Sequence, residues 1–321
     1  MSCREQIRRL EAFVSEKIIG QKTLINRLLI ALLADGHLLV EGAPGLAKTR
    51  AIKMLSEGVA ADFHRVQFTP DLLPADLTGT DIFRPQDGSF KFQQGPLFHN
   101  LILADEINRA PAKVQSALLE AMAERQITVG TETYTLPRLF LVMATQNPIE
   151  QEGTYPLPEA QLDRFLMHVR IGYPNKDEER EILNLTRAEA HATQALADDL
   201  ATLPQQVLFD AREEVLDHYM SENLQEYILE LVMATRSPER YGSDLAKWVE
   251  YGASPRATIA LDRCARAHAW LANRDYVSPQ DVQTLAFDVL RHRVLLSYEA
   301  EAEGITPERL INELIQRVAV P

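Results

Sequence analysis

Residues 42–49, GAPGLAKT, have the residue types and spacing of a phosphate-binding loop. The general pattern is G-x-x-x-x-G-K-[ST], which Gly42, Lys48 and Thr49 match, whereas Ala47 stands where the second glycine is expected. The stretch lies between the apolar run HLLVE and a helical pattern, so backbone N–H groups and a helix N-terminus would face bound phosphates. Lys48 would reach the terminal phosphates and the Thr49 hydroxyl would bind Mg²⁺. Taken alone, the stretch fits an ATP site, a degraded site or an accident of composition.

An acid pair ends another predicted strand. The run LILADE places Asp105 and Glu106 at the carboxyl end of a buried strand, where side chains face the ligand crevice of an open α/β sheet. Asp105 could hold the Mg²⁺ shell, and Glu106 could accept a proton from an attacking water. An exposed acidic pair at a strand end is the competing interpretation. Its separation from Lys48, with one strand and crossover between them, argues against that alternative.

Four further polar residues could act at the same site. Asn147, in ATQNP, could orient the water with its amide, although Asn before Pro is also an ordinary turn signal. Arg164 in AQLDRF has no evident local role beyond pairing with Asp163, and Arg256 in SPR begins a helix, where the helix dipole disfavours a cation. Arginine suits the stabilisation of a transferring phosphoryl group, but a surface arginine needs no such role. Arg109 in DEINRA is suggestive too, and a surface salt bridge explains it equally well.

The pattern of the elements that must position these residues predicts a parallel α/β sheet. The first 173 residues alternate short apolar runs with helical patterns. Two inserted β-hairpins are expected, at 81–92 with Asp87-Gly88 as the turn, and at 125–136 around Gly130. The predicted strands cover residues 37–41, 63–68, 101–105, 139–145 and 165–171.

After residue 174 the pattern changes to helices only. Asn175 with Glu178 three residues on is a plausible capping pattern. Later helix starts are signalled by Ser-Pro or Thr-Pro pairs at 254–255, 278–279 and 306–307. A chain of 321 residues is long for one compact domain. We therefore expect an α/β domain at 1–174 and a helical domain at 175–321.

Composition excludes several classes of protein. The net charge of -13 argues against a general polyanion binder, so nucleic acid is a disfavoured partner, although a local basic groove could exist. Cys3 and Cys264 lack metal-ligand spacing and are expected to be thiols in a reducing compartment. No apolar run approaches the roughly 20 residues of a membrane helix, and the N-terminus lacks a signal-peptide core. We expect a cytoplasmic protein without a membrane span.

The ordered series GAPGLAKT, LILADE, ATQNP, LPEAQLDRF and SPR resembles an AAA+ ATPase, and its first and fourth motifs resemble the MoxR family. The resemblance covers essentially the whole chain, from IIGQ at 18–21 to the helical lid. It implies a P-loop NTPase parallel-sheet core with two β-hairpin insertions, followed by an all-α lid domain. Alanine is frequent at the position of Ala47 in this family, so the loop departs from the general pattern and not from the subgroup.

The resemblance also implies a role for each motif. Asp105 with Glu106 is similar to the Walker B pair, and Asn147 to the sensor-1 residue. Arg164 resembles the arginine finger that one subunit inserts into its neighbour's site, and Arg256 resembles sensor 2, which reaches the γ-phosphate. The implied catalytic residues are Glu106, Asn147, Arg164 and Arg256, and the implied metal ligands are Thr49 and Asp105. The implied nucleotide-binding residues are Ile18, Ile19, Gly20, Gly42, Ala43, Pro44, Gly45, Leu46, Ala47, Lys48, Thr49 and Arg50.

The function implied by this resemblance is that of a hexameric, Mg·ATP-dependent, chaperone-like motor. Such a motor remodels, assembles or activates client proteins, usually with a partner that has a von Willebrand factor A domain. Three alternatives stay open. A helicase or initiator-like AAA+ protein would need a basic pore lining or a DNA-binding domain, and neither is visible. A nucleotide-gated scaffold would have negligible turnover, and a chelatase motor subunit would stimulate metal insertion into a porphyrin.

Overall fold

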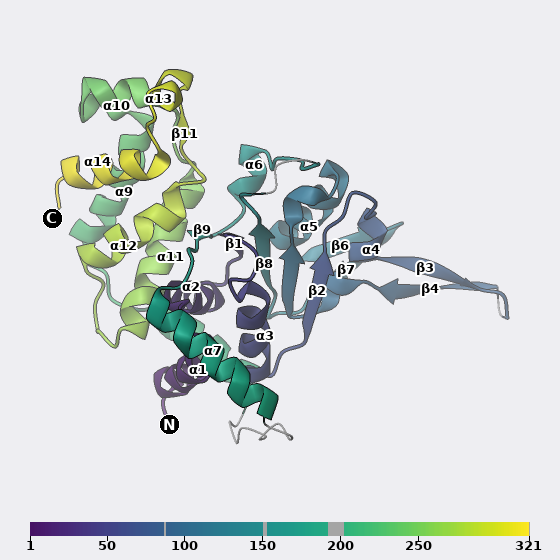
Figure 1. Ribbon diagram of the computed structural model, residues 1–321. Helices are drawn as coiled ribbons and strands as arrows, with labels where there is room; N and C mark the ends of the chain where they lie inside the picture. The colour runs from purple at the N-terminus through teal and green to yellow at the C-terminus, as the bar shows by residue number, and fades with distance from the viewer. Residues whose placement is uncertain (87, 150–152, 192–201, 321) are drawn as a thin grey trace. The chain divides into compact units, whose positions relative to one another are not determined.

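The computed structural model describes residues 1–86, 88–149, 153–191 and 202–320 (Figure 1). The chain divides into two compact units. The first, here called the sheet unit, comprises residues 1–29, 37–157 and 169–209. The second, the helical unit, comprises residues 30–36, 158–168 and 210–321. The domain boundary near residue 174 stays a prediction.

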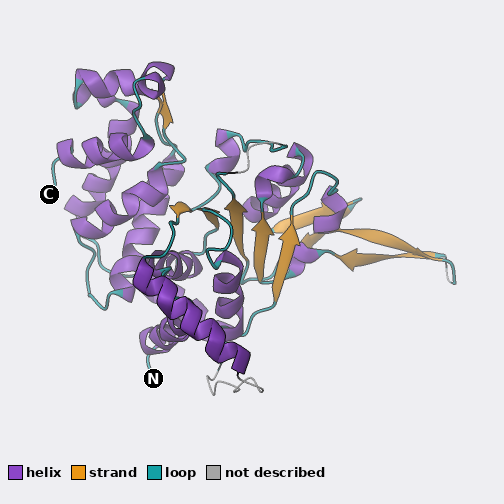
Figure 2. Cartoon of the chain, viewed as in Figure 1, coloured by secondary structure: helices purple, strands orange, loops and turns teal. Residues whose placement is uncertain are grey.

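A five-stranded sheet forms the centre of the sheet unit (Figure 2). Its strand order is β2-β5-β8-β1-β9. Its strands are β1 Leu38–Glu41, β2 Phe63–Gln67, β5 Leu101–Asp105, β8 Leu141–Gln146 and β9 Met167–Arg170. The pairs β1–β8, β8–β5 and β5–β2 are all parallel. The side chains of β5 from Leu101 to Ala104 are buried, as expected for a strand covered on both faces. All five predicted strands are confirmed.

Helices and short helical turns connect the strands. The loop after β1 leads directly into α3, and the loop after β5 leads through a short 3-10 turn into α5. The helices of this unit are α1 Cys3–Lys17, α2 Lys22–Leu33, α3 Lys48–Gly58, α4 Pro74–Thr78, α5 Ala112–Glu124 and α7 Lys176–His191, and the turns are Pro96–Phe98 and Ile107–Arg109. Helix α2 and the later α8, Gln205–Leu216, each continue from one unit into the other.

Two hairpins interrupt this alternation, as predicted. Strands β3 Gly79–Arg84 and β4 Ser89–Gln94 form the first, and β6 Gln126–Val129 with β7 Glu132–Thr135 form the second. Gly88 and Gly130 have positive φ in the two turns, whereas Asp87 lies outside the described residues. The Phe92 ring stacks on the Tyr134 ring at 4.2 Å between centroids, so an aromatic contact joins the two hairpins.

Several helices of the helical unit begin with a capped turn. Ser254 and Thr306 accept hydrogen bonds from the first-turn backbone, and Ser278 with Asp281 forms a capping box, so the three predicted starts are confirmed. The capping pattern at Asn175 and Glu178, in the sheet unit, is also present. Besides α8, the helices are α6 Glu159–Leu162, α9 Glu222–Arg236, α10 Ser243–Trp248, α11 Pro255–Leu271, α12 Pro279–Leu290, α13 Tyr298–Ala302 and α14 Pro307–Arg317, with a 3-10 turn at Pro238–Arg240.

The expectation that only helices follow residue 174 was wrong in one place. Strands β10 Val249–Tyr251 and β11 Leu295–Leu296 pair antiparallel within the helical unit. Strands of three and two residues are too short to produce a visible alternation of apolar and polar side chains. Within the described part of the chain, no helix combines the length and apolar character needed to cross a membrane.

Candidate functional site

Residues 42–47 form the loop between β1 and α3, with Lys48 and Thr49 in the first turn of that helix. The ammonium of Lys48 donates a hydrogen bond to the Gly42 carbonyl oxygen at 2.6 Å, which folds the loop back over the helix start. Burial lowers the pKa of Lys48, and the negative charges of Asp105 and Glu106 act in the opposite direction. The lysine of the loop and the acid pair therefore share one electrostatic environment, although 57 residues separate Lys48 from Asp105 in the sequence.

The loop backbone explains both its glycines and its one mismatch. Gly45 has a φ of +83°, which favours glycine, and a Cβ on Gly42 would lie 2.5 Å from Cγ1 of Ile171. Ala47 has a φ of 56° and a ψ of 19°, so it too is left-handed. An L-residue in this conformation costs roughly 1–2 kcal/mol, a penalty that glycine avoids. Alanine at position 47 thus keeps the conformation at the expense of local strain.

Asp105, at the end of β5, uses both of its carboxylate oxygens. Oδ1 accepts a hydrogen bond from the Thr145 hydroxyl at 2.6 Å. Oδ2 accepts from Nη2 of Arg65 at 2.6 Å and from Nε of the same arginine at 3.1 Å. Thr145 comes from the parallel neighbour β8 and Arg65 from β2, so both adjacent strands fix this carboxylate.

Glu106 is the first residue after β5 and has a left-handed backbone, with a φ of 57° and a ψ of 51°. Its N–H donates to the Thr145 hydroxyl at 2.9 Å. Its Oε2 accepts hydrogen bonds from Nε2 of Gln67 at 2.8 Å and from Nη1 of Arg109 at 2.9 Å. The salt bridge expected of Arg109 is therefore present, and it is made to the acid pair itself.

Asn147 follows β8 at the same edge of the sheet, as its position in the sequence predicts. The residue is buried, and its Oδ1 accepts a hydrogen bond from the Ile149 backbone at 3.1 Å. This contact is the turn interaction that was the alternative to a catalytic role. The position is compatible with both interpretations, because the turn bond uses the amide oxygen while the amide nitrogen is the donor that could orient a water.

The segment at 18–20 packs against the chain just after β9. Ile18 is buried, and a Cβ on Gly20 would lie 3.0 Å from Cβ of Pro174. Gln21 donates to the Gly172 carbonyl oxygen at 3.2 Å, which holds the two segments together. Arg50 of the predicted nucleotide-binding set has another partner, because its guanidinium pairs with Glu189 of α7.

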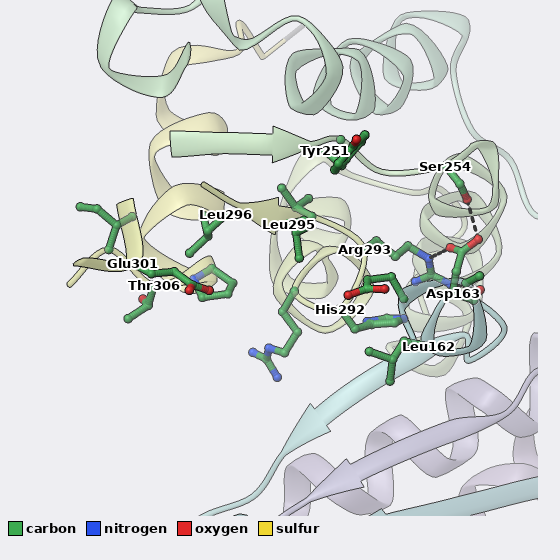
Figure 3. Close-up of a pocket in the computed structure, with 17 residues that line it drawn as sticks. Leu162, Asp163, Tyr251, Ser254, His292, Arg293, Leu295, Leu296, Glu301 and Thr306 are labelled. Atoms are coloured by element: carbon green, nitrogen blue, oxygen red, sulfur yellow. Dashed lines mark hydrogen bonds and ion pairs between the residues drawn. The ribbon is translucent and has the colours of Figure 1, made fainter. Parts of the chain in front are cut away.

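Both predicted arginines of the helical unit lie close to Asp163: Arg164 is its neighbour in the sequence, and Arg256 is near it in space. Arg164 lies two residues after the end of α6 and is half-buried. Asp163 accepts a hydrogen bond from the Ser254 hydroxyl at 2.8 Å and pairs with Nε of Arg293 at 2.9 Å (Figure 3). Arg256 lies 3.8 Å from the same carboxylate, and its side chain is half exposed. A cavity of about 660 Å³ in this unit is lined by Asp163 and Arg293, among others.

Four residues that the sequence did not single out contribute to these clusters: Arg65, Gln67, Thr145 and Arg293. The first three lie at or near the carboxyl ends of β2 and β8. A polar residue at the end of an otherwise apolar run was the signal that could have identified Thr145. Arg293 has only 2% of its side chain exposed. It follows the end of a helix in a sequence without a recognisable motif, so no local pattern could have linked it to Asp163.

The left-handed Ala47 leads to a stability prediction. Replacing Ala47 by glycine relieves the backbone strain of roughly 1–2 kcal/mol in the folded state. Glycine also raises the conformational entropy of the unfolded chain, which lowers the free energy of unfolding by about 0.4–1 kcal/mol. We expect a net gain of about 0.5 kcal/mol in the free energy of unfolding, measured by urea denaturation. The matched control is Ala51→Gly in the interior of α3, which should lose about 1 kcal/mol. If Ala47→Gly lost as much stability as the control, the backbone strain inferred at Ala47 would be contradicted.

Comparison with known proteins agrees with this architecture. A family model described as "ATPase family associated with various cellular activities (AAA)" matches residues 37–167, and one described as "AAA lid domain" matches residues 245–314. Chaperone MoxR1 of Mycobacterium tuberculosis is 47% identical over 312 residues, which cover 96% of this chain and 80% of that protein. Protein MoxR of Paracoccus denitrificans is 34% identical over 332 residues, covering 98% and 96%.

A solved structure is similar over the whole length of the chain. It is a crystal structure of a Cytophaga hutchinsonii protein, an ATPase candidate by its description, with a TM-score of 0.90 and 47% sequence identity. The match covers 99% of this chain and 96% of that one. The sequence resemblance is thereby confirmed, and the chain belongs to the MoxR family of AAA+ ATPases.

Proposed function

We propose that this MoxR-type ATPase binds Mg·ATP at residues 42–49, hydrolyses it with a water activated by Glu106, and uses the energy to remodel partner proteins. The observation that carries the proposal is the parallel pairing of β1 with β8 and of β8 with β5, which brings the loop with Lys48 and the acid pair to one edge of the sheet. A phosphate-binding lysine and two carboxylates at one edge of a parallel sheet are the parts that phosphoryl transfer to water requires.

The residues at this edge fit a magnesium nucleotide. Mg²⁺ prefers oxygen ligands, which the Asp105 carboxylate and the Thr49 hydroxyl can supply. The N-terminus of α3 and the Lys48 ammonium suit a triphosphate, because both present positive charge to it. When bound, the ion would neutralise charge on the phosphates.

Glu106 is held in an orientation that suits a general base. The two hydrogen bonds that its carboxylate accepts, from Gln67 and Arg109, both reach Oε2. Oε1 is then the atom that would accept the proton of the attacking water. The amide of Asn147, at the end of the neighbouring strand β8, would orient that water.

The proposed assembly is a hexameric ring in which Arg164 of one subunit completes the site of the next. A guanidinium supplied in trans stabilises the charge that develops on the transferred phosphoryl group. Arg256 keeps the sensor-2 role that the resemblance implies, and its half-exposed side chain is compatible with a phosphate ligand. The proposed partner is a protein with a von Willebrand factor A domain, acting with a client in the cytoplasm.

The base role of Glu106 predicts a trapped variant. Glu106→Gln keeps the hydrogen-bonding shape of the side chain but cannot accept the proton, so ATP turnover should fall by about 10²-fold or more. Binding of ATP should persist, measured with a fluorescent analogue alongside phosphate release. The control is Glu120→Gln, an exposed position of α5, which should hydrolyse ATP normally. Normal turnover by Glu106→Gln would exclude the base role.

The trans role of Arg164 predicts that inactive variants complement each other. Arg164→Ala alone should lose about 10³-fold in turnover, the usual contribution of an arginine finger. Mixed with Glu106→Gln it should regain activity, because some interfaces then combine an intact Glu106 with an intact Arg164. The control mixture pairs Arg164→Ala with the double variant Arg164→Ala/Glu106→Gln, which offers no complete interface. Equal phosphate release from the two mixtures would show that Arg164 does not act across subunits.

A further inference from the structure

Every N–H group of the Arg293 side chain has an acceptor within the helical unit. Nε donates to Oδ1 of Asp163 at 2.9 Å, a pair that is drawn in Figure 3. Nη2 donates to the carbonyl oxygens of Asp163 at 3.3 Å and of Phe165 at 2.5 Å. Nη1 donates to the carbonyl oxygens of Leu166 at 3.1 Å and of Val289 at 2.6 Å. A guanidinium group carries five N–H donors, so these five bonds use all of them.

The backbone acceptors lie on both sides of Arg164. Asp163 directly precedes Arg164 in the chain, and Phe165 directly follows it. The Phe165 side chain is fully buried, and Arg293 has only 2% of its side chain exposed. A guanidinium group is planar and rigid, so the peptide groups that bind it are held at fixed positions relative to one another. The backbone at Arg164 is therefore held through its two neighbours.

The two residues that precede this buried arginine bind the same chain segment after α6. Nη1 of Arg291 donates to the His168 carbonyl oxygen at 2.9 Å, and Nε2 of His292 donates to the Phe165 carbonyl oxygen at 3.2 Å. Burial lowers the pKa of His292 well below its usual range, which keeps the ring uncharged at neutral pH. Residues 291–293, which directly follow α12, thus hold this segment and are here called the clamp.

Asp163 also connects the segment to the start of α11. The Ser254 hydroxyl donates to Oδ2 of Asp163 at 2.8 Å and accepts from the Arg256 N–H at 3.1 Å. Ser254 is the N-cap of α11, so one hydroxyl both caps that helix and binds the carboxylate. The segment after α6, the start of α11 and the clamp after α12 all belong to the helical unit, and they meet at Asp163.

We propose that Arg293 is a positioning residue for the arginine finger: it holds the backbone on both sides of Arg164 and so sets where that guanidinium is presented to the neighbouring subunit. This role rests on the proposed function, because it concerns the finger of the same ATP site. A finger acts only when its guanidinium reaches the transferred phosphoryl group, and a displacement of about 1 Å can cost about 10²-fold in rate. Arg293 therefore affects hydrolysis in the next subunit and not in its own.

A lysine at this position separates the positioning role from two simpler ones. If Arg293 served only to balance the charge of Asp163 or to bind the last carbonyl groups of α12, an ammonium group could replace it. An ammonium group donates from a single nitrogen, whereas Arg293 donates from three. Lysine therefore keeps the charge but cannot hold the backbone on both sides of Arg164.

The first test is the rate of phosphate release by Arg293→Lys. We expect a fall of about 10²-fold, because the finger is displaced while Glu106 and the phosphate-binding loop are unchanged. Binding of a fluorescent ATP analogue should persist. The control is Arg317→Lys, which removes a guanidinium fork on Asp244 elsewhere in the helical unit and should hydrolyse ATP normally. Normal turnover by Arg293→Lys would overturn the proposal.

Mixtures of variants show in which subunit Arg293 acts. An active interface needs an intact Glu106 in one subunit and a correctly placed finger from the next. Mixed with Glu106→Gln, Arg293→Lys should regain phosphate release, because the first variant supplies the finger and the second supplies Glu106. Mixed with Arg164→Ala, Arg293→Lys should gain nothing, because neither variant presents a finger correctly.

A defect in the subunit's own site gives the reverse pattern. Arg293→Lys would then still present its finger, so it would restore activity to Arg164→Ala and would fail to complement Glu106→Gln. A disturbance of Arg256, which lies near Asp163 and is proposed to sense the nucleotide of its own subunit, belongs to this case. The reverse pattern would therefore exclude the positioning role.

A second variant covers the case in which Arg293→Lys does not fold, which thermal unfolding detects. Asp163→Asn/Arg293→Gln removes both charges together, so neither is left buried without its partner. This double variant should complement in the same way, and failure of a folded variant to complement Glu106→Gln contradicts the proposal. If Arg164→Ala itself gains nothing from Glu106→Gln, the proposed trans role of Arg164 fails, and the role of Arg293 falls with it.

Discussion

The parallel pairing of β5 with β8 and of β8 with β1 is the constraint on which the rest of this site depends. Parallel strands have their carboxyl ends at a common edge of the sheet. The strand pairing alone therefore brings together the loop after β1, the acids at the end of β5 and the asparagine after β8. The hydroxyl of Thr145 adds a direct bond between strands, because it donates to Asp105 and accepts from the N–H of Glu106. The acid pair is thus oriented by backbone pairing and by one shared hydroxyl.

Local strain is concentrated at the same edge. Ala47 and Glu106 are both left-handed without being glycine, and each stands at a junction between a strand and the helical segment that follows it. Such conformations persist where the surrounding structure over-determines them, and they cluster at functional sites. Here the surrounding structure is the buried sheet beneath, whose central strands are apolar along nearly their full length.

The sequence predicted the architecture well because its signals are periodic and local. Apolar runs identified the strands, and the capping residues identified the helix starts. The mismatch at Ala47 could not be interpreted from the sequence alone, because only the backbone dihedral angles show that Ala47 adopts the left-handed conformation that favours glycine. Arg65 and Gln67 were missed because alternating polar residues on a strand are ordinarily a solvated face, and the register that brings them to Asp105 is a tertiary property. The buried pairing of Arg293 with Asp163 depends on tertiary contacts in the same way.

In the proposed function, Lys48 and the acid pair form one nucleotide site. Its most direct test is calorimetric titration of the wild type and of Lys48→Ala with ATP, in Mg²⁺ and in EDTA. We expect tight binding by the wild type that depends on Mg²⁺, and a loss of at least about tenfold in affinity in Lys48→Ala, because a charged hydrogen-bonding partner is removed. Equal affinity of the two proteins for ATP would contradict it.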